Sequence, residues 1–454
     1  MKILIAGGGK VGATLTRQLT SEGHAVTLID RSSDVLEAIM GQYDVMAVQG
    51  NAAVLDILEQ AGVKDSDLLI AATDRDEVNL LACMTAHGLN PKIHTIGRIR
   101  NPEYRRQAYE MRSVFGLNMV INPEREAAHD IARLLKYPGF RTIETFAKGN
   151  VEIVEVQVTH DSKLNHVALN QLSKIVHCKV LVCAVQRGDQ CLMPDGNFVL
   201  QENDHLYVTA ETENLSTLLI SLGMISNGVK NVLITGGGRI SFYLAQQLQQ
   251  SGISCQIIEK DHQRCMDLAV SLPETRIVEG DASNQNLLEE ERLESYDALI
   301  NLTGLDELNI VMSLYGAAKG VKHVITKMSH AENNLLINEL QLGSVVSPKE
   351  LTCNSIVQYV RAMENSHDAA VSIHRIANGQ AEAVEFRIDE SAKNVGKKFK
   401  DLNLKKNVLI SSVSHGWSTE IASGNTSYEV GDTVVVVTQS GTPLMQFNDI
   451  FEAA

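Results

Sequence analysis

The sequence contains no apolar run close to the roughly 20 residues that a membrane-spanning helix needs, and its mean hydropathy is −0.05. We therefore expect no insertion into a membrane. The first residues, Met1–Ala6, run into three glycines before the apolar segment of a signal peptide could form. They are predicted to form a first strand instead.

The sequence has fewer basic than acidic residues. Lys and Arg total 40 against 55 Asp and Glu, so the net charge is −15. An acidic surface repels phosphate backbones, which argues against nucleic acid as a partner. Cysteine motifs are also absent, because the seven cysteines form no CxxC pair and no zinc-like spacing. Reduced thiols in a cytosolic protein, without a metal site, are the simplest interpretation.

The rest of the composition is ordinary for a globular protein, with 44% hydrophobic and 21% charged residues. This excludes a disordered tail, a collagen-like repeat and a coiled-coil rod. A chain of 454 residues predicts about three domains, or two larger modules that each have two parts.

An internal repeat favours the two-module arrangement. The segment Lys2–Gly9 is echoed by Asn231–Gly238, and further landmarks recur at nearly the same spacing: Asp30 and Glu259, Gly50-Asn51-Ala52 and Gly280-Asp281-Ala282, Asp76–Asn79 and Asp306–Asn309, Arg98 and Lys327, Pro123 and Pro348. So many landmarks in register indicate a tandem duplication, with its joint near residues 225–229.

Each copy begins with short apolar runs that alternate with helical patterns, which is typical of βαβ units in a parallel sheet. In the first copy the predicted strands are Ile3–Ala6, Ala25–Ile29, Val45–Val48, Leu68–Ala72, Ile93–Ile96 and Met119–Ile121. Between them, Val11, Leu15 and Leu19 are predicted to share one helical face, and Leu80, Leu81 and Met84 another.

After residue 138 the pattern changes to alternating strands, such as Glu152–Val158 and His205–Val208, and the same change follows Asn365. The predicted fold class is α/β, with two tandem Rossmann-type, doubly wound parallel sheets that are each followed by a small α+β unit. The predicted units are 1–138, 139–224, 230–364 and 365–454.

The segment Gly7-Gly8-Gly9-Lys10-Val11-Gly12 fits G-x-G-x-x-G directly after a strand and at the start of a helix. In that context the first glycine permits the tight turn, the second lets a pyrophosphate approach the backbone, and the third lets the helix pack closely. The helix N-terminus then offers free N–H groups to the phosphates. The alternative is a glycine turn with a solvated carboxylate at the end of the following strand, and the agreement of loop, context and carboxylate favours the nucleotide site over it.

That carboxylate is Asp30, at the end of the second strand, where it can accept both ribose hydroxyls and so favours NAD over NADP. Arg31 beside it could partly offset the repulsion of a 2′-phosphate. Thr73 and Asp74 follow the fourth strand at the same edge, where they could cap the next helix or contact ligand. Lys10 and Arg98 are candidate partners for a terminal phosphate, although Arg98 could also be solvated or inter-subunit.

The second copy differs in its loop. Gly236-Gly237-Gly238-Arg239-Ile240-Ser241 keeps the first two glycines of the motif, but serine replaces the third. Glu259 keeps a ribose-binding carboxylate, whereas Gly304 stands where Asp74 stands in the first copy. Two interpretations remain open for this copy, namely a weaker or differently selective nucleotide site and a purely structural repeat.

Taken together, the motifs resemble the TrkA family of cytosolic regulatory subunits of bacterial Trk potassium-uptake systems, built from tandem RCK (or KTN) domains. The resemblance covers the whole chain and rests on these segments: the glycine loop, Gly50-Asn51-Ala52, Thr73-Asp74 with Asp76-Glu77 and Asn79, Arg98–Tyr104, Asn122-Pro123-Glu124 and Pro194-Asp195-Gly196. The departures are Asn51, where the family often has Asp, and Ser241 with Gly304.

The resemblance implies a nucleotide-sensing protein that binds NAD(H) and ATP or ADP without catalysis. It implies a homo-oligomeric ring, a tetramer in our interpretation, on the inner face of the plasma membrane. The implied partner is a membrane potassium transporter subunit of the TrkH or TrkG type. The implied cofactor-binding residues are Gly7, Gly8, Gly9, Lys10, Val11, Gly12, Asp30, Arg31, Asn51, Ala52, Thr73, Asp74 and Arg98, with Gly236, Gly238, Arg239, Ile240 and Glu259 in the second copy.

A competing hypothesis is an NAD-dependent dehydrogenase of a small substrate. Such an enzyme usually needs a general acid or base near the nicotinamide. The sequence offers no obvious His/Asp or Tyr/Lys pair after the first Rossmann unit, and His160, His166 and His177 have no recognisable partner.

Overall fold

The computed structural model describes residues 1–224, 228–329, 340, 342–364, 370–416, 418–439, 444 and 446–452. The expected joint at residues 225–227 and the expected boundary at Asn365 lie outside the described residues. The chain forms two compact units. One unit comprises Met1–Ala127 and Ser347–Val357, and the other comprises Ala128–Val346 and Gln358–Ala454.

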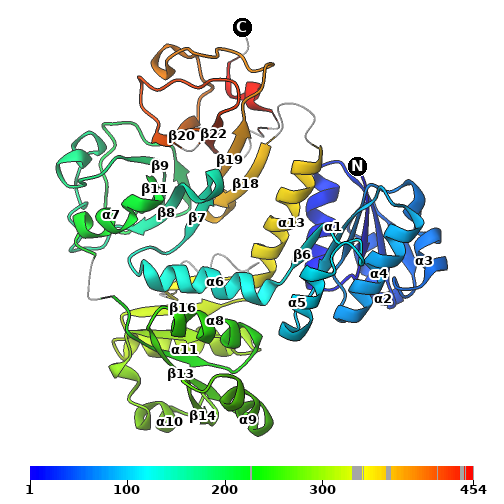
Figure 1. Cartoon of the computed structure of the whole chain (residues 1–454). Helices are drawn as coiled ribbons and strands as arrows, with labels where there is room; N and C mark the ends of the chain where they lie inside the picture. The colour runs from blue at the N-terminus through cyan, green and yellow to red at the C-terminus, as the bar shows by residue number, and fades with distance from the viewer. Residues whose placement is uncertain are drawn as a thin grey trace. The chain divides into compact units, whose positions relative to one another are not determined.

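The first unit contains a six-stranded parallel sheet in the order β3-β2-β1-β4-β5-β6, with helices on both faces (Figure 1). This is the doubly wound order of a Rossmann fold. Its strands are β1 (Lys2–Ala6), β2 (Ala25–Asp30), β3 (Met46–Gln49), β4 (Leu68–Ala71), β5 (His94–Arg98) and β6 (Met119–Ile121). Its helices are α1 (Lys10–Ser21), α2 (Ser33–Met40), α3 (Leu55–Gln60), α4 (Asp76–Leu89) and α5 (Pro102–Glu110).

The predicted strands of this sheet are confirmed to within a residue or two at their ends. They are nearly continuous in apolar residues because the crossover helices bury both faces, and every residue of β4 is buried. The predicted core face of α1 is also confirmed, since Val11, Leu15 and Leu19 are all buried.

The apolar face predicted for α4 lies mostly away from the sheet, although Leu80 packs against the core. The side chains that face the sheet are Asn79, Ala82, Cys83 and Ala86, whereas Leu81 and Met84 are 45% and 41% exposed. Small side chains let this helix lie close to the strands, so the larger apolar residues point outward. Sequence periodicity alone marks an apolar stripe without showing which neighbour covers it.

A second parallel sheet repeats the first in the order β14-β13-β12-β15-β16-β17. Its strands are β12 (Asn231–Thr235), β13 (Ser254–Glu259), β14 (Arg276–Glu279), β15 (Ala298–Asn301), β16 (His323–Lys327) and β17 (Ser344–Val346). The accompanying helices are α8 (Arg239–Gln250), α9 (His262–Ser271), α10 (Gln285–Glu290) and α11 (Asp306–Ala318). Helix α13 (Pro348–Glu364) follows β17 in the chain, and its residues up to Val357 belong to the unit of the first sheet. The structure thus confirms the α/β fold with two doubly wound sheets.

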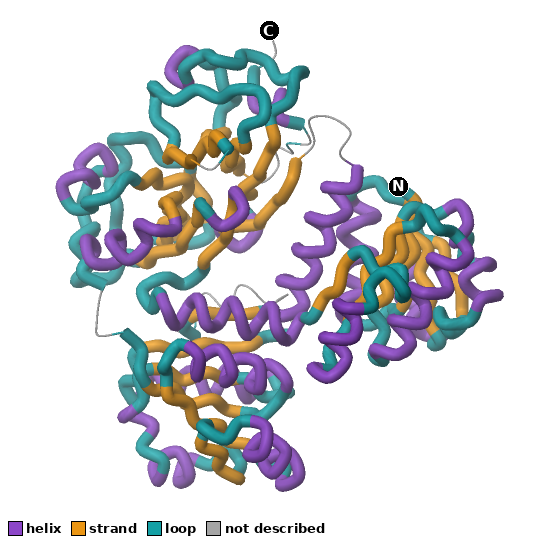
Figure 2. The backbone as a smooth tube through the Cα atoms, viewed as in Figure 1, coloured by secondary structure: helices purple, strands orange, loops and turns teal. Residues whose placement is uncertain are grey.

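Each parallel sheet is followed in the chain by an antiparallel five-stranded sheet (Figure 2). After helix α6 (Pro123–Lys136), the first of these has the order β10-β9-β11-β8-β7, and the second has the equivalent order β21-β20-β22-β19-β18. The first is built from β7 (Ile143–Phe146), β8 (Val151–Gln157), β9 (Val180–Arg187), β10 (Gln190–Leu192) and β11 (His205–Glu211), with α7 (Leu215–Leu222). The second is built from β18 (Ala370–Ile376), β19 (Ala381–Arg387), β20 (Val408–His415), β21 (Ser418–Ile421) and β22 (Thr433–Gln439).

The two antiparallel sheets share one apolar cluster, which includes Phe146 and Tyr207 from the first sheet and Ile376 and Val435 from the second. His374 adds a polar contact, because its Nδ1 lies 2.6 Å from Glu144 Oε2. The two small units therefore form an internal pair within one chain.

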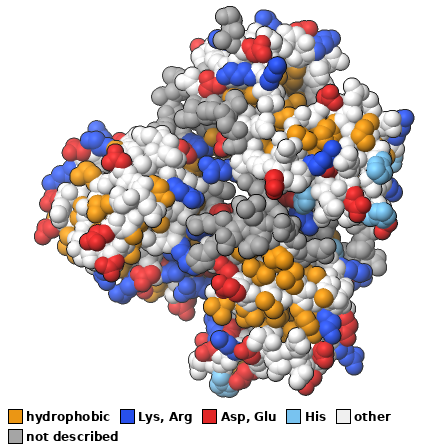
Figure 3. All heavy atoms as spheres, turned by 180° about the vertical axis from the view of Figure 1, so that it is seen from behind, with side chains coloured by type: hydrophobic (Ala, Val, Ile, Leu, Met, Phe, Trp, Pro, Cys, Tyr) orange, Lys and Arg blue, Asp and Glu red, His pale blue; other side chains and the backbone are white. Residues whose placement is uncertain are grey.

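Acidic and basic side chains are interspersed over the face drawn in Figure 3, with apolar side chains between them. Within the described residues, no helix is both long and apolar enough to cross a bilayer.

Candidate functional site

The glycine loop joins β1 to α1, and two of its glycines are required by the fold itself. Gly7 has φ +101°, a conformation that L side chains rarely adopt. A Cβ at Gly12 would lie 1.8 Å from the carbonyl oxygen of Gly7. Any side chain at position 12 would push the helix away from the loop.

Gly9 is different, because nothing in the folded chain requires a glycine there. Its backbone is extended, with φ −67° and ψ −169°, and a Cβ at this position would meet no atom within 4 Å. The residue is exposed and precedes the first turn of α1, where backbone N–H groups lack intrahelical partners. The loop therefore leaves open the space in which an anion would meet those N–H groups.

Asp30 closes the other side of the cradle. Its Oδ2 accepts a hydrogen bond from Gly8 N at 2.7 Å, and its Oδ1 accepts one from Ser32 N at 2.9 Å. An ionised carboxylate has about four lone-pair sites, so two remain for ligand hydroxyls. The position at the end of β2 is the one that sequence reasoning predicted.

A buried amide fixes the carboxyl ends of β4 and β5. Asn79 is fully buried on α4, and its Oδ1 accepts hydrogen bonds from Thr73 N at 2.9 Å and Thr73 Oγ1 at 2.7 Å. Its Nδ2 donates to the carbonyl oxygen of Arg98 at 2.8 Å. The Thr73 hydroxyl is thus part of a clamp between two strands. This role of Asn79 was missed, although the recurrence of Asn at the equivalent position of the repeat was its signal.

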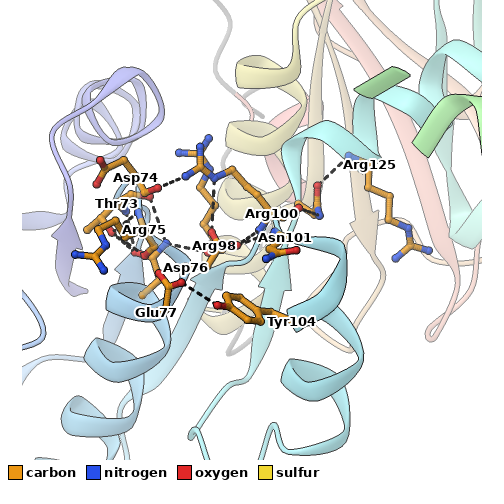
Figure 4. A network of polar contacts seen from close by, with 12 residues as sticks. Thr73, Asp74, Arg75, Asp76, Glu77, Arg98, Arg100, Asn101, Tyr104 and Arg125 are labelled. Carbon is orange, nitrogen blue, oxygen red and sulfur yellow. Dashed lines mark hydrogen bonds and ion pairs between the residues drawn. The ribbon is translucent and has the colours of Figure 1, made fainter. Parts of the chain in front are cut away.

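Asp76 and Arg100 extend the network (Figure 4). Asp76 Oδ2 accepts hydrogen bonds from the backbone N–H groups of Arg100 at 2.8 Å and Asn101 at 2.7 Å. The Arg100 guanidinium donates to the carbonyl oxygen of Asp74, and its Nε lies 3.6 Å from Asp76 Oδ1. The sequence marked Asp76 only as a recurring landmark, whereas the structure shows that it positions the turn after β5.

The side chain of Asp74 is exposed at this edge, as are those of Lys10 and Arg31. Glu77 instead points to α5, where its Oε1 accepts a hydrogen bond from Tyr104 Oη at 3.0 Å. Its own backbone N–H and then the Tyr104 hydroxyl lower the pKa of Glu77. The cradle therefore combines several exposed charges at its rim with a buried, hydrogen-bonded floor.

Three of the predicted site residues in the two copies have buried apolar side chains, namely Val11, Ala52 and Ile240. Only their backbone groups are available to a ligand. Asn51 forms a turn after β3, in which its Oδ1 accepts from Ala53 N at 3.2 Å.

The second cradle repeats this backbone arrangement. Gly236 has φ +93°, and a Cβ at Gly238 would meet no atom within 4 Å. Glu259 Oε2 accepts from Gly237 N at 2.6 Å and its Oε1 accepts from Asp261 N at 2.9 Å. The longer carboxylate therefore holds the loop as Asp30 does.

Ser241 takes the place of the third glycine of the motif. Its hydroxyl donates to the carbonyl oxygen of Gly236, the atom equivalent to the one that a Cβ at Gly12 would strike. The expected tolerance of serine is confirmed, because α8 still begins directly after the loop.

A chain of buried polar side chains runs behind the second cradle. Thr235 Oγ1 donates to Asn301 Oδ1 at 2.8 Å, and Asn301 Nδ2 donates to Ser313 Oγ at 2.8 Å. Ser313 Oγ also lies 2.6 Å from Thr326 Oγ1. All four side chains are fully buried. The equivalent residues of the first sheet are Ala6, Ala71, Cys83 and Gly97.

The histidines of the first small unit have partners that the sequence did not reveal. His160 Nδ1 lies 3.2 Å from Glu202 Oε2 at the surface, and the bond raises the pKa of His160. His205 Nδ1 lies 2.7 Å from Glu155 Oε1 across neighbouring strands. His160, for which the sequence offered no recognisable partner, therefore has one in Glu202. Both pairs belong to the antiparallel sheet and its surface loops.

Comparison with known proteins agrees with this doubled geometry. The sequence matches the TrkA-N domain over residues 3–123 and 232–348, and the TrkA-C domain over residues 153–222 and 383–451. The chain belongs to the TrkA family. The matched segments contain both glycine loops, both carboxylates and most of both antiparallel sheets.

Relatives in the TrkA family match over nearly their full length. The Trk system potassium uptake protein TrkA of Haemophilus influenzae is 30% identical, with 100% of this chain and 99% of that protein covered. The protein of the same name from Vibrio alginolyticus is 31% identical, with coverage of 96% and 95%. A TrkA homolog from Archaeoglobus fulgidus is also 31% identical, with coverage of 96% and 97%.

Solved structures share the fold at low sequence identity. The GsuK RCK domain has a TM-score of 0.62 at 18% identity, with 97% of this chain and 92% of that chain covered. The GsuK channel bound to NAD has a TM-score of 0.61 at 18% identity, with 97% and 77% covered. At this identity the likeness concerns the fold alone.

Proposed function

We propose that this chain is a nucleotide-sensing regulatory subunit of a membrane potassium transporter. In this proposal it binds NAD(H) and the adenine nucleotides ATP and ADP at the first cradle and performs no catalysis. Occupancy of the cradle alters an assembly of several chains and thereby ion flux.

The observation that carries the nucleotide assignment is the conformation of Gly9. Its φ and ψ suit any residue and the space above it is empty of protein atoms, so the fold gives no reason for the missing side chain. A ligand that must approach the backbone at van der Waals distance does give one. The adjoining carboxylate of Asp30, with lone pairs left over, fits a ribose.

The residues then divide into three proposed roles. The loop N–H groups and the N-terminus of α1 bind the pyrophosphate. Asp30 binds the hydroxyls of the adenosine ribose. Lys10, Thr73, Asp74 and Arg98 meet the part of the ligand that varies, a terminal phosphate or a nicotinamide. Arg100 joins this last group because its guanidinium contacts the carbonyl of Asp74.

The names of the relatives support the transporter assignment, since each is called a Trk system potassium uptake protein. A structure of similar fold is titled as a channel bound to NAD. We propose a partner of the TrkH or TrkG type and a location on the inner face of the plasma membrane.

The outer surface of the first unit supports a homo-oligomer. Helices α4 and α5 and the turn after α5 expose several large apolar side chains, in a part of the fold where a monomer would gain nothing from them. These residues are Leu81, Met84, Tyr109, Met111 and Val114. We propose that copies of the chain, four in our interpretation, bury this face in a ring.

The experiment is a fluorescence titration of NADH into the full chain, run beside an assay for NADH consumption with candidate metabolites. We expect saturable binding that ADP competes away, without turnover. Steady oxidation of NADH by a metabolite would instead support the dehydrogenase hypothesis. Potassium flux through the reconstituted transporter with ATP, ADP and NADH tests the regulatory part.

A further inference from the structure

The second cradle contains a guanidinium that has no counterpart in the first. Arg264 lies in the first turn of α9, whose N-cap Asp261 accepts from Arg264 N at 2.7 Å. Its Nε donates to the carbonyl oxygen of Gly237 at 2.7 Å, and its Nη2 lies 3.4 Å from that of Gly238. The side chain therefore reaches the glycine loop from the side of the ribose-binding carboxylate.

The charge of Arg264 has no carboxylate partner among the described residues, and its only hydrogen bonds there go to the two loop carbonyls. An arginine has five N–H donors, so most of them remain available. The side chain also leaves the cradle open, since a Cβ at Gly238 would still meet no atom within 4 Å. Arg264 thus sits beside the phosphate space without filling it.

Position 35 is equivalent to position 264 in the first copy and is occupied by Val35, the third residue of α2. A Cβ on Gly8 would lie only 2.5 Å from the Cγ1 methyl group of Val35, so this apolar side chain packs directly against the loop. The position equivalent to Arg264 therefore supplies no charge to the first cradle, where the guanidinium on that side is the exposed one of Arg31, next to Asp30. Arg98 and Arg100 lie at and after the end of β5, on the opposite side of β1 from Asp30.

The opposite side of the second cradle carries fewer charges, although Lys327 stands at the place of Arg98 and its Nζ donates to the carbonyl oxygen of Thr303 at 2.7 Å. Leu305 stands where the first copy has Arg75, and Gly304 where it has Asp74. Ser329 replaces Arg100, and its backbone N–H donates to the Asp306 carboxylate as that of Arg100 does to Asp76. In a Rossmann cradle the carboxylate side holds the adenosine, and the side across the switch point holds the rest of the ligand.

On the basis of the proposed nucleotide binding, we propose that the second cradle is a separate site for nucleoside monophosphates, with Arg264 as its phosphate-binding residue. The guanidinium contacts the α-phosphate while Glu259 holds the ribose. A diphosphate or dinucleotide gains little further, because Gly304, Leu305 and Ser329 are uncharged and Lys327 Nζ already donates to the Thr303 carbonyl. The first cradle senses the distal half of the ligand, and the second senses only the adenosine phosphate half.

The test measures AMP binding to the full chain by isothermal titration calorimetry. A Gly9→Val variant blocks the first cradle, so that the remaining AMP binding is due to the second cradle. We expect one AMP per chain, with NADH binding within about threefold of AMP. Adding Arg264→Val, the residue of the first copy, should weaken AMP binding about ten- to hundredfold, as expected for a lost charged hydrogen bond. Arg264→Lys should restore part of it.

A second measurement does not depend on the Gly9 variant. The unmodified chain should bind two AMP molecules at saturation, and the Arg264→Val chain should bind one at the same concentration. Equal AMP affinity with and without Arg264, or NADH much tighter than AMP in the second cradle, overturns the proposal. Absence of any nucleotide binding to the unmodified chain would instead overturn the proposed function, so the two failures are distinguishable.

Discussion

The two glycine cradles have nearly the same backbone and different chemistry. Asp30 and Glu259 each accept two backbone N–H groups, one from the loop and one from the start of the next helix. Asn79 and Asn309 each clamp the ends of two neighbouring strands. These shared bonds maintain the shape of the cradle. Several charged side chains around it differ between the copies, such as Asp74, Arg75 and Arg100 in the first and Gly304, Leu305 and Ser329 in the second.

The comparison separates the residues that maintain the shape of the cradle from those whose charge differs between the copies. The polar floor is buried, and its groups bond to one another, so a change there costs stability. Asp74 and Arg75 at the rim are exposed, so exchanging them costs the fold little. A duplicated domain can therefore acquire a second ligand preference without rebuilding its loop.

The largest expected effect distinguishes the glycines within the first loop. Gly9→Val should weaken NADH and ADP binding by roughly a hundredfold or more, because a side chain occupies the phosphate space, while the melting temperature stays unchanged. Gly12→Val should destabilise the fold itself, since its Cβ would lie 1.8 Å from the Gly7 carbonyl oxygen. Isothermal titration calorimetry measures the ligand affinity of each variant, and scanning calorimetry measures its melting temperature. A Gly9→Val chain that binds normally would contradict the site.

The carboxylates allow a matched test between the copies. Asp30→Ala should lose one charged hydrogen bond to the ribose, at about 1.5–3 kcal/mol, or roughly ten- to hundredfold in affinity. Asp30→Glu, which introduces the residue of the second copy, should lose much less. NADH titration of both variants decides the matter. Equal losses would mean that the length of the side chain matters more than its charge.

The third prediction concerns the distal side of the first cradle. Arg98→Ala should reduce the difference between ATP and ADP in transporter flux more than it reduces ADP binding. Several chains must act together, because shifting a population from mostly closed to mostly open needs about 5.5 kcal/mol, more than one typical coupling energy of about 1–3 kcal/mol. Lys327→Ala in the second copy is the control. If the Arg98→Ala variant still separates ATP from ADP as the unmodified chain does, the residues that discriminate the two nucleotides lie elsewhere.

The buried polar chain of the second sheet should be sensitive to truncation. Ser313→Ala leaves Asn301 Nδ2 and Thr326 Oγ1 with one partner fewer, and an unsatisfied buried group costs about 1–3 kcal/mol. Cys83→Ala at the equivalent site of the first sheet removes only a weak sulfur contact, 3.8 Å from Ile96 O. Hydrogen exchange of the backbone amides of β15 in the Ser313→Ala variant and of β4 in the Cys83→Ala variant compares the two substitutions. Equal loss of protection would show that the polar chain adds nothing.

The smallest effect concerns pH and compares α6 with α13. Burial, and then the neighbouring Glu144 charge, raise the pKa of Asp130 on α6 to about 7, whereas Ser355 stands at the equivalent place of α13. A folded pKa above the unfolded value of about 3.9 means that stability falls as pH rises between those values. Asp130→Ser should therefore raise the melting temperature slightly at pH 8 and not at pH 4. The Arg133 charge limits the gain.

The sequence was sufficient for the features that recur with a fixed period or stand at a strand end. The strands of the first sheet, the loop glycines and both carboxylates were placed correctly, because burial on both faces and the G-x-G-x-x-G spacing are local patterns. Asn79 and Arg100 were missed as site residues. Their roles depend on how α4 and the turn after β5 meet, and no local pattern encodes that meeting.

The same reason explains what the apolar stripe of α4 left open. The pattern predicted that Leu80, Leu81 and Met84 share a face, but not that Leu81 and Met84 are exposed while the small residues Ala82 and Ala86 face inward. The Arg264 contact was equally invisible, since it joins α9 to a loop whose residues lie more than twenty positions earlier. Side-chain reach between elements is a tertiary property.

The first compact unit is completed by residues far away in the sequence, Ser347–Val357 on α13. There Cys353 is fully buried, with its Sγ 3.8 Å from the carbonyl oxygen of Val11, and Thr352 Oγ1 lies 3.3 Å from Glu126 Oε2. A ribosome makes the chain from its N-terminus, so the first nucleotide cradle is made early but its supporting helix arrives only after the second parallel sheet. Until α13 has been synthesised, part of the apolar surface of the nascent first unit stays uncovered. A gene fragment that encodes the first half alone should therefore yield an aggregation-prone product.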